Sequence, residues 1–124
     1  MIMLTVLAAA AVASPVQGDW SVDLRTDLSA KPYSQPMRLD VAADGKLTGT
    51  FYGGPIAEGR AATSNGRTCF AFNTADQSGP YHHAGCLRGA AIEGQSWSTG
   101  RNFLLAWRAD RPTAEAAKPK PAKP

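Results

Sequence analysis

The sequence has few of the patterns that build helices or common catalytic centres. Once residues 1–18 are set aside, no stretch repeats its apolar residues with the helical period, so amphipathic helices are not expected. No phosphate loop, nucleophile elbow or paired-carboxylate motif is present, and neither CxxC nor HxxxH occurs. These absences argue against a nucleotide-dependent enzyme, a common hydrolase and a zinc protein. We therefore predict no catalytic residue, no cofactor and no metal ion.

Charge is missing from the start of the chain. Met1–Gly18 contains no Lys, Arg, Asp or Glu, and its apolar run ends in Ala11-Val12-Ala13, a small-x-small cleavage pattern. We predict a signal peptide at residues 1–18, cut after Ala13 or after Gly18, and a periplasmic or secreted protein. The alternative is a buried first helix. The apolar run is shorter than the roughly 20 residues that a transmembrane helix needs, so no membrane span is expected.

The C-terminal segment has no apolar pattern of its own. Pro112–Pro124 alternates Ala, Lys and Pro, which predicts a disordered tail because such a segment cannot bury a core. Three Lys against one Glu give this tail +2 of the net charge of +3. Between the two ends, residues 19–111 form one predicted domain. Its basic residues are dispersed among acidic ones, so we predict no nucleic-acid partner.

Turn residues divide the predicted domain into short runs that are typical of β-strands. Asp44-Gly45 and Asn65-Gly66, each between apolar runs, are strong hairpin signals. Regular spacing of such strands predicts an all-β protein, an eight-stranded antiparallel up-and-down β-barrel with short hairpin loops. The predicted strands span residues 20–25, 35–42, 46–52, 56–62, 67–74, 81–88, 91–98 and 101–109.

The turns also predict which residues face one another. A three-residue loop at 43–45 gathers the apolar residues of its two strands on one face, and a one-residue slip would expose them. Two-residue loops are predicted at 65–66, 89–90 and 99–100. The first pairs Ala61 with Phe70 and Gly59 with Phe72, and the second pairs Leu87 with Ile92. The third pairs Ser96 with Phe103 and Ile92 with Trp107. All registers agree on one inner set of large side chains: Trp20, Val22, Leu24, Met37, Leu39, Val41, Leu47, Phe51, Phe70, Phe72, Leu87, Ile92, Phe103, Leu105 and Trp107.

Cys69 and Cys86 are equidistant from the centre of the loop at 75–80. A symmetric hairpin places them directly opposite, which predicts a disulfide on the outer face, as expected for an exported protein. A redox-active pair is disfavoured because no basic group is expected beside either sulfur. A zinc site with His82 and His83 is also disfavoured, since neighbouring residues on a strand point to opposite faces.

Polar residues of the predicted inner face gather at one end of the barrel. Tyr81 and Thr74 lie near His83 there, and ligand sites are often apolar cups with a few polar groups at a barrel mouth. We predict a small pocket, with Tyr33 as a lid and Arg101 attracting an anionic group. The alternative to a pocket is an interior filled by side chains. The alternative to a binding site is an active site that uses His83 and Tyr81. The predicted lining is Met37, Phe51, Phe72, Tyr81, His83, Ser96 and Phe103.

Two functions follow from these patterns. The first is a non-catalytic binding module for a small, partly apolar ligand. The second is a protein-interaction module, for example an inhibitor of an envelope or host enzyme, which would bind its partner through the face around Trp97, a residue predicted to point outward.

One stretch of the chain carries a resemblance to a known family. Gly18-Asp19-Trp20 and the later run VAADGKLTGTFY (Val41–Tyr52) resemble the opening hairpins of the avidin and streptavidin family. That resemblance implies an eight-stranded up-and-down barrel. Val22, Phe51 and Gly53 stand where that family has a ligand-binding Asn, Tyr and Ser, so it does not imply biotin binding. The chain is also similar to small exported bacterial proteins of the same barrel pattern, from which no activity follows.

Overall fold

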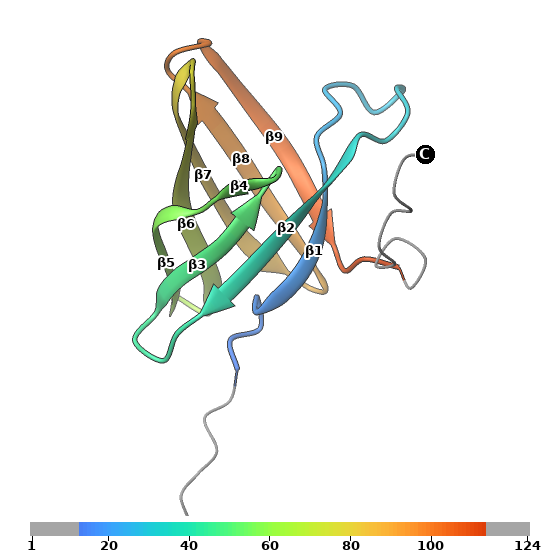
Figure 1. Cartoon of the computed structure of the whole chain (residues 1–124). Helices are drawn as coiled ribbons and strands as arrows, with labels where there is room; N and C mark the ends of the chain where they lie inside the picture. Colours follow the sequence, from blue (N-terminus) through green and yellow to red (C-terminus); the bar gives the residue numbers. More distant parts are fainter. Residues whose placement is uncertain (1–12, 114–124) are drawn as a thin grey trace, which may run out of the picture.

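Residues 13–113 are described in the computed structural model, and they form a closed antiparallel β-barrel (Figure 1). Each long strand pairs with its neighbours in the chain, and the first strand closes the ring by pairing with the last. The predicted all-β, eight-stranded barrel is confirmed, with a two-residue strand, β4, added beside β3. The strands are β1 (Gly18–Asp23), β2 (Ser34–Val41), β3 (Lys46–Phe51), β4 (Gly54–Pro55), β5 (Ala57–Ser64), β6 (Arg67–Asp76), β7 (Gly79–Arg88), β8 (Ala91–Ser98) and β9 (Phe103–Asp110).

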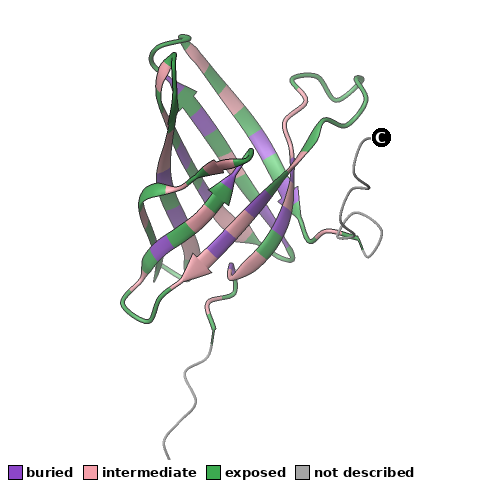
Figure 2. Ribbon diagram, viewed as in Figure 1, coloured by how far each residue is buried: buried purple, intermediate pink, exposed green. Residues whose placement is uncertain are grey.

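Side chains alternate between a buried inner face and an exposed outer face along the strands (Figure 2). On β9, for example, Trp107 and Ala109 are buried whereas Ala106 and Arg108 are exposed. This alternation follows from the pleat of a strand, which sends successive side chains to opposite faces. The buried apolar core consists of Val16, Trp20, Val22, Met37, Leu39, Leu47, Phe51, Ala61, Phe70, Phe72, Ala91, Ile92, Trp107 and Ala109.

Four of the five predicted hairpin loops have the expected register. Gly45 has a φ of 90° at the end of its three-residue loop, a conformation that a side chain would strain. Asn65 and Gly66 both have positive φ, as a type I′ turn requires. The loop at 77–78 places Cys69 opposite Cys86. The pairings Val41–Leu47, Ala61–Phe70, Phe72–His83 and Leu87–Ile92 all follow as predicted.

The last hairpin differs from its prediction by two residues. Ser96 pairs with Leu105 and Ser98 pairs with Phe103, so the expected pairing of Ser96 with Phe103 is wrong. The loop extends over 99–102 because the hydroxyl of Ser98 accepts a hydrogen bond from the backbone N–H of Arg101, and Asn102 adopts a positive φ of 54°. A two-residue shift keeps every side chain on its predicted face.

The fourth predicted strand, 56–62, is also interrupted. β4 pairs with the end of β3, and β5 pairs with its start through Lys46 and Leu47. Between them the register with β6 shifts around Glu58, whose φ is 54°. Gly59 therefore pairs with Leu47, and its predicted ladder pairing with Phe72 is replaced by this bulge.

Cys69 and Cys86 form the predicted disulfide between β6 and β7, and their Cα atoms lie 4.0 Å apart. No free cysteine remains within residues 13–113. The bridge joins two strands that are already paired, so it secures a hairpin rather than two distant parts of the barrel.

The barrel begins before the predicted boundary at Asp19. Val16 is fully buried in the core, and its carbonyl accepts a 2.8 Å hydrogen bond from the indole N–H of Trp20. Gly18 is the first residue of β1. The predicted leader up to residue 12 and the predicted tail from residue 114 lie outside the described residues. Within residues 13–113, no helix is both long and apolar enough to cross a membrane.

Candidate functional site

The barrel has two distinct ends. We call the mouth the end that carries the loops at 24–33, 52–53, 77–78 and 99–102, which lies at the top of Figure 1. We call the base the opposite end, where Ser14–Gln17 and the loops at 42–45, 65–66 and 89–90 lie. The predicted pocket residues belong to the mouth and to the core directly beneath it.

His83 is the centre of the floor beneath the mouth. Its side chain is buried, and both ring nitrogens have partners. Nε2 lies 2.8 Å from the hydroxyl of Thr74, and Nδ1 lies 2.6 Å from the hydroxyl of Ser96. The indole N–H of Trp107 donates a 2.9 Å hydrogen bond to the same Ser96 oxygen. Each buried polar group of this floor is therefore satisfied within the barrel.

Aromatic rings surround the imidazole of His83. The ring centroid of Phe51 lies 4.3 Å from that of His83, and Phe72 follows at 4.9 Å. Burial among these rings, with a smaller contribution from the charge of His82, lowers the pKa of His83 to about 4. His83 is consequently a neutral imidazole at physiological pH, with one nitrogen that donates and one that accepts.

The wall above this floor is only partly covered. Phe103 and Leu105 face inward, because they pair with the buried Ser98 and Ser96, yet both are only half-buried. Tyr81 is half-buried on the same inner face. In the lower barrel the inward side chains of Ile92 and Leu47 are buried, whereas those of Val41 and Leu87 are half-buried. The mouth therefore presents an apolar inner wall to solvent above a closed floor.

A cation and an acid lie at the rim of the mouth. The guanidinium of Arg101 lies 5.3 Å from the ring centroid of Phe103, and the ring centroid of Tyr81 lies 6.2 Å from that of Phe103. The hydroxyl of Tyr81 donates a 2.8 Å hydrogen bond to Asp76. This bond, together with the N–H of Ser78 and the charge of Arg101, lowers the pKa of the Asp76 carboxyl. Arg101 is thus close enough to act electrostatically on the acid across the rim.

Two tyrosines close the other side of the rim. The hydroxyls of Tyr33 and Tyr52 are hydrogen-bonded to each other, and their ring centroids lie 6.2 Å apart. Both side chains are about half exposed, at 45% and 49%. The hydrogen bond between the two hydroxyls raises the pKa of Tyr52, and the positive charge of Arg101 acts in the opposite direction. The long β1–β2 loop is tied to the β3–β4 turn through this pair.

The structure brings the predicted pocket residues to one end of the barrel, where they divide into two layers. The floor contains the buried residues Met37, Phe51, Phe72, His83 and Ser96, and the wall and rim contain Tyr33, Tyr81, Arg101 and Phe103. The sequence did not identify Trp107 as part of this site, because the two-residue error in the last hairpin placed it opposite Ile92. Tyr52 was missed because alternation from Phe51 points it outward, whereas its positive φ turns the chain at the rim.

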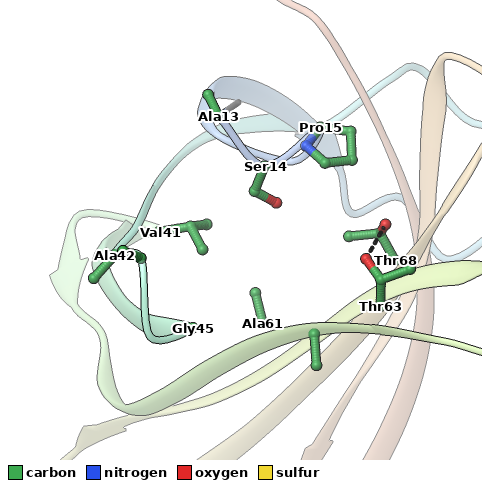
Figure 3. Close-up of a pocket in the computed structure, with 11 residues that line it drawn as sticks. Ala13, Ser14, Pro15, Val41, Ala42, Gly45, Ala61, Thr63 and Thr68 are labelled. Carbon is green, nitrogen blue, oxygen red and sulfur yellow. Dashed lines mark hydrogen bonds between the residues drawn. The ribbon is translucent and has the colours of Figure 1, made fainter. Parts of the chain in front are cut away.

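A separate hollow lies at the base. It has a volume of about 570 Å³ and is bordered by Ser14, Val41 and the hydrogen-bonded pair Thr63 and Thr68 (Figure 3). Methyl groups and hydroxyls line it, without a charged side chain among its lining residues. Nothing in the sequence predicted a hollow at this end of the barrel.

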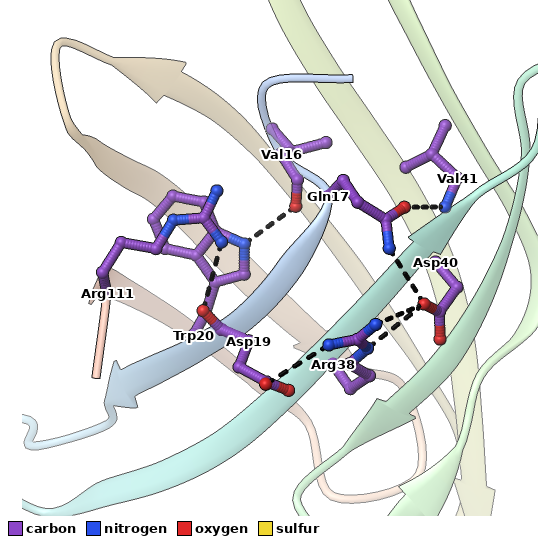
Figure 4. A network of polar contacts seen from close by, with 8 residues as sticks. All are labelled: Val16, Gln17, Asp19, Trp20, Arg38, Asp40, Val41 and Arg111. Atoms are coloured by element: carbon purple, nitrogen blue, oxygen red, sulfur yellow. Dashed lines mark hydrogen bonds and ion pairs between the residues drawn. The ribbon is translucent and has the colours of Figure 1, made fainter. Parts of the chain in front are cut away.

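A polar network attaches the N-terminal segment beside this hollow (Figure 4). The side-chain amide of Gln17 bridges β2, donating to Asp40 and accepting from the backbone N–H of Val41. The guanidinium of Arg111 lies 3.8 Å from the ring centroid of Trp20 and donates to the carbonyl of Pro15. Both ends of the described chain are therefore fixed at the base.

The outer face of β7–β9 carries exposed apolar residues. Trp97 is 40% exposed and Leu104 is 64% exposed, and the register places them side by side with His82. The next row along the same strands contains Ala84, Gln95 and Ala106, none of which is charged. We call these six residues the Trp97 face.

The comparisons with known proteins leave this geometry to be interpreted by itself. No family model, no curated protein and no solved structure matches the chain. Among residues 13–113, no group of three or more His, Cys, Asp or Glu is arranged to hold a metal ion. What the structure defines is a class, a small closed β-barrel with one disulfide and a solvent-accessible aromatic mouth.

Proposed function

We propose that the protein is a non-catalytic binding module that takes a small, partly apolar ligand into the mouth of the barrel. The observation that carries this proposal is the inner wall of Phe103 and Leu105, which is only half-buried above the buried floor. Apolar side chains that face a lumen and still contact water gain free energy when a ligand covers them. Both nitrogens of His83 are occupied by hydroxyls, which favours binding over general-base catalysis.

The rim adds a preference for charge. Arg101 is exposed and lies over the ring of Phe103, so its guanidinium is available to a carboxylate or a similar anion that stacks beside an aromatic surface. We further propose that the chain is exported to the periplasm or secreted. The disulfide supports this location, because such bonds persist in oxidising compartments.

Two adjacent leucines allow a matched test. Leu105 points into the mouth, whereas Leu104 lies on the outer Trp97 face of the same strand. The probe is 1-anilinonaphthalene-8-sulfonate, an aromatic anion whose fluorescence rises in apolar surroundings. We expect Leu105→Gln to abolish the fluorescence gain and Leu104→Gln to preserve it, with both variants shown to be folded by thermal denaturation. The reverse result would overturn a site at the mouth.

Arg101→Gln tests the anionic preference, and Arg67→Gln, an exposed arginine of the base, is its control. We expect about a tenfold weaker affinity for the sulfonate in the first variant, equivalent to the loss of about 1.4 kcal/mol. Equal affinities of the two variants would show that Arg101 does not contact the anion.

The Trp97 face supports a second candidate function, a protein-interaction module such as an inhibitor of an envelope or host enzyme. Exposed tryptophan beside leucine on an uncharged strip is typical of a protein contact surface. In a pull-down against an envelope extract, Trp97→Ala and Leu104→Gln should both lose a partner that Leu105→Gln retains. The same leucine pair therefore separates the two functions.

A further inference from the structure

A chain of hydrogen bonds crosses the floor of the mouth from β9 to β6. It runs from the indole N–H of Trp107 to the hydroxyl of Ser96, then to His83 Nδ1, and from His83 Nε2 to the hydroxyl of Thr74. The three donor–acceptor distances are 2.9, 2.6 and 2.8 Å. Ser96 and His83 are each only 4% exposed, so water does not complete their hydrogen bonding.

The direction of this chain follows from the chemistry of its first member. An indole N–H only donates, so the oxygen of Ser96 accepts from Trp107. The buried Ser96 hydroxyl must then donate its own proton, and His83 Nδ1 is its one remaining partner among the described residues. The neutral imidazole therefore carries its hydrogen on Nε2 and donates it to the oxygen of Thr74. This assignment of the tautomer rests on the hydrogen-bond network.

Thr74 is the last member of this hydrogen-bonded chain, and its O–H remains available as a donor. Its oxygen accepts from His83, and within the described residues its O–H has no acceptor of its own. Thr74 is half-buried and pairs with Tyr81, so it lies on the inner wall at the junction of floor and mouth. A hydroxyl in this position borders the space in which the proposed ligand would lie.

We propose that the Trp107–Ser96–His83 chain holds the Thr74 hydroxyl as a hydrogen-bond donor to the ligand, which therefore carries an acceptor oxygen, a carbonyl or carboxylate, on an apolar or aromatic body. This inference rests on the proposed function of the mouth. Arg101 at the rim favours anionic ligands by charge attraction, and an ammonium group has no oxygen to accept the hydrogen bond from Thr74. Trp107, Ser96 and His83 are positioning residues, because they act on the ligand through Thr74.

The first test needs no ligand. Long-range ¹H–¹⁵N spectra of the ring nitrogens of His83 at pH 7 should show the hydrogen on Nε2. Ser96→Ala removes the donor to Nδ1, so the hydrogen should redistribute between the two nitrogens, and Ser96→Thr should restore the original spectrum. A hydrogen on Nδ1 in the unaltered protein would reverse the chain and overturn the inference.

The second test compares three small aromatic probes, benzoate, acetophenone and benzylamine, by NMR titration. We expect benzoate and acetophenone to shift the signals of Thr74 and His83, and benzylamine to leave them unchanged. Thr74→Val, which removes only the hydroxyl, should weaken benzoate binding about tenfold, and Thr74→Ser should restore most of the affinity.

These outcomes separate this inference from the proposed function. If the aromatic sulfonate binds the mouth but Thr74→Val binds benzoate as well as the unaltered protein does, the ligand class is wrong and the binding site stands. If the sulfonate, benzoate and acetophenone all fail to bind at the mouth, the proposed function is wrong, and with it the ligand class.

Discussion

The indole ring of Trp107 on β9 occupies the space that Gly94 leaves open on β8, directly opposite it in the sheet. A Cβ at position 94 would collide with three atoms of the six-membered ring. Since the same indole donates to Ser96, the absence of a side chain at Gly94 positions the first member of the hydrogen-bonded chain beneath the mouth.

Gly94→Ala should therefore destabilise the barrel and disturb the mouth together. Forcing a methyl group into a packed interior typically costs about 1–3 kcal/mol. Gly54→Ala is the matched control, because a Cβ there meets its nearest atom at an ordinary 3.6 Å. Urea denaturation should show a lower free energy of unfolding for Gly94→Ala and little change for Gly54→Ala. Equal stabilities would contradict the packing of Trp107 over Gly94.

Burial of His83 makes the stability of the barrel depend on pH. The pKa of His83 falls from 6.5 to about 4 on folding. Between these pH values the unfolded chain binds a proton that the folded chain does not, so the free energy of unfolding decreases as the pH falls through this window. Between neutral pH and pH 4, the titration of His83 lowers the free energy of unfolding by at most about 3 kcal/mol.

Denaturation midpoints at pH 7 and pH 4.5 measure this effect. His83→Gln should flatten the dependence, whereas His82→Gln, a change of the exposed neighbour, should keep most of it because burial is the larger cause of the shift. If the pH dependence of stability persists undiminished in His83→Gln, other titratable groups must cause it.

The disulfide should contribute measurably to stability. Cys69 and Cys86 are separated by 17 positions, and closing a loop of that size in the unfolded chain is worth about 3 kcal/mol in the chain-entropy model. Cys69→Ala/Cys86→Ala should therefore unfold at lower temperature while keeping the barrel's circular dichroism spectrum. Non-reducing mass spectrometry of exported protein tests the bond itself, and two free thiols would refute it.

The N-terminal segment distinguishes the two predicted cleavage sites. Cleavage after Gly18 would remove the fully buried Val16 and the bridge that Gln17 makes to β2, whereas cleavage after Ala13 would keep both. We expect exported protein to begin at Ser14, as measured by its intact mass. A chain shortened to begin at Asp19 should be less stable by about 2 kcal/mol or more from the loss of Val16 alone. A mature protein that begins at Asp19 with unchanged stability would contradict this expectation.

The hairpins whose turn residues carry a clear sequence signal were predicted correctly. Asp44-Gly45 and Asn65-Gly66 demand positive φ, and the cysteines confirm the register of β6 with β7 independently. These local signals were enough to predict the barrel and to separate its inner from its outer face.

The errors arose in two situations. A register shift can leave the alternation of inward and outward side chains intact, and a bulge can depend on contacts between strands that are distant in the sequence. A two-residue shift of β9 keeps Leu105 and Trp107 inside, so no hydrophobic pattern distinguishes the two registers. The bulge at Glu58 depends on how β5 pairs with β3 and β6, and no turn residue in the sequence indicates it. Val16 lies within the predicted leader of residues 1–18, where composition alone does not separate a core residue from a signal peptide.

The contact between Arg111 and the carbonyl of Pro15 has a consequence for the connectivity of the fold. Because the Arg111 side chain bridges the two ends at the base, a flexible glycine linker should join Thr113 to Ser14 while the strands keep their pairing. New termini could then open in the exposed loop at 26–32, on the opposite side of the molecule. Such a circular permutant would have the same barrel with its order of synthesis changed, and both of its free ends would lie beside the mouth.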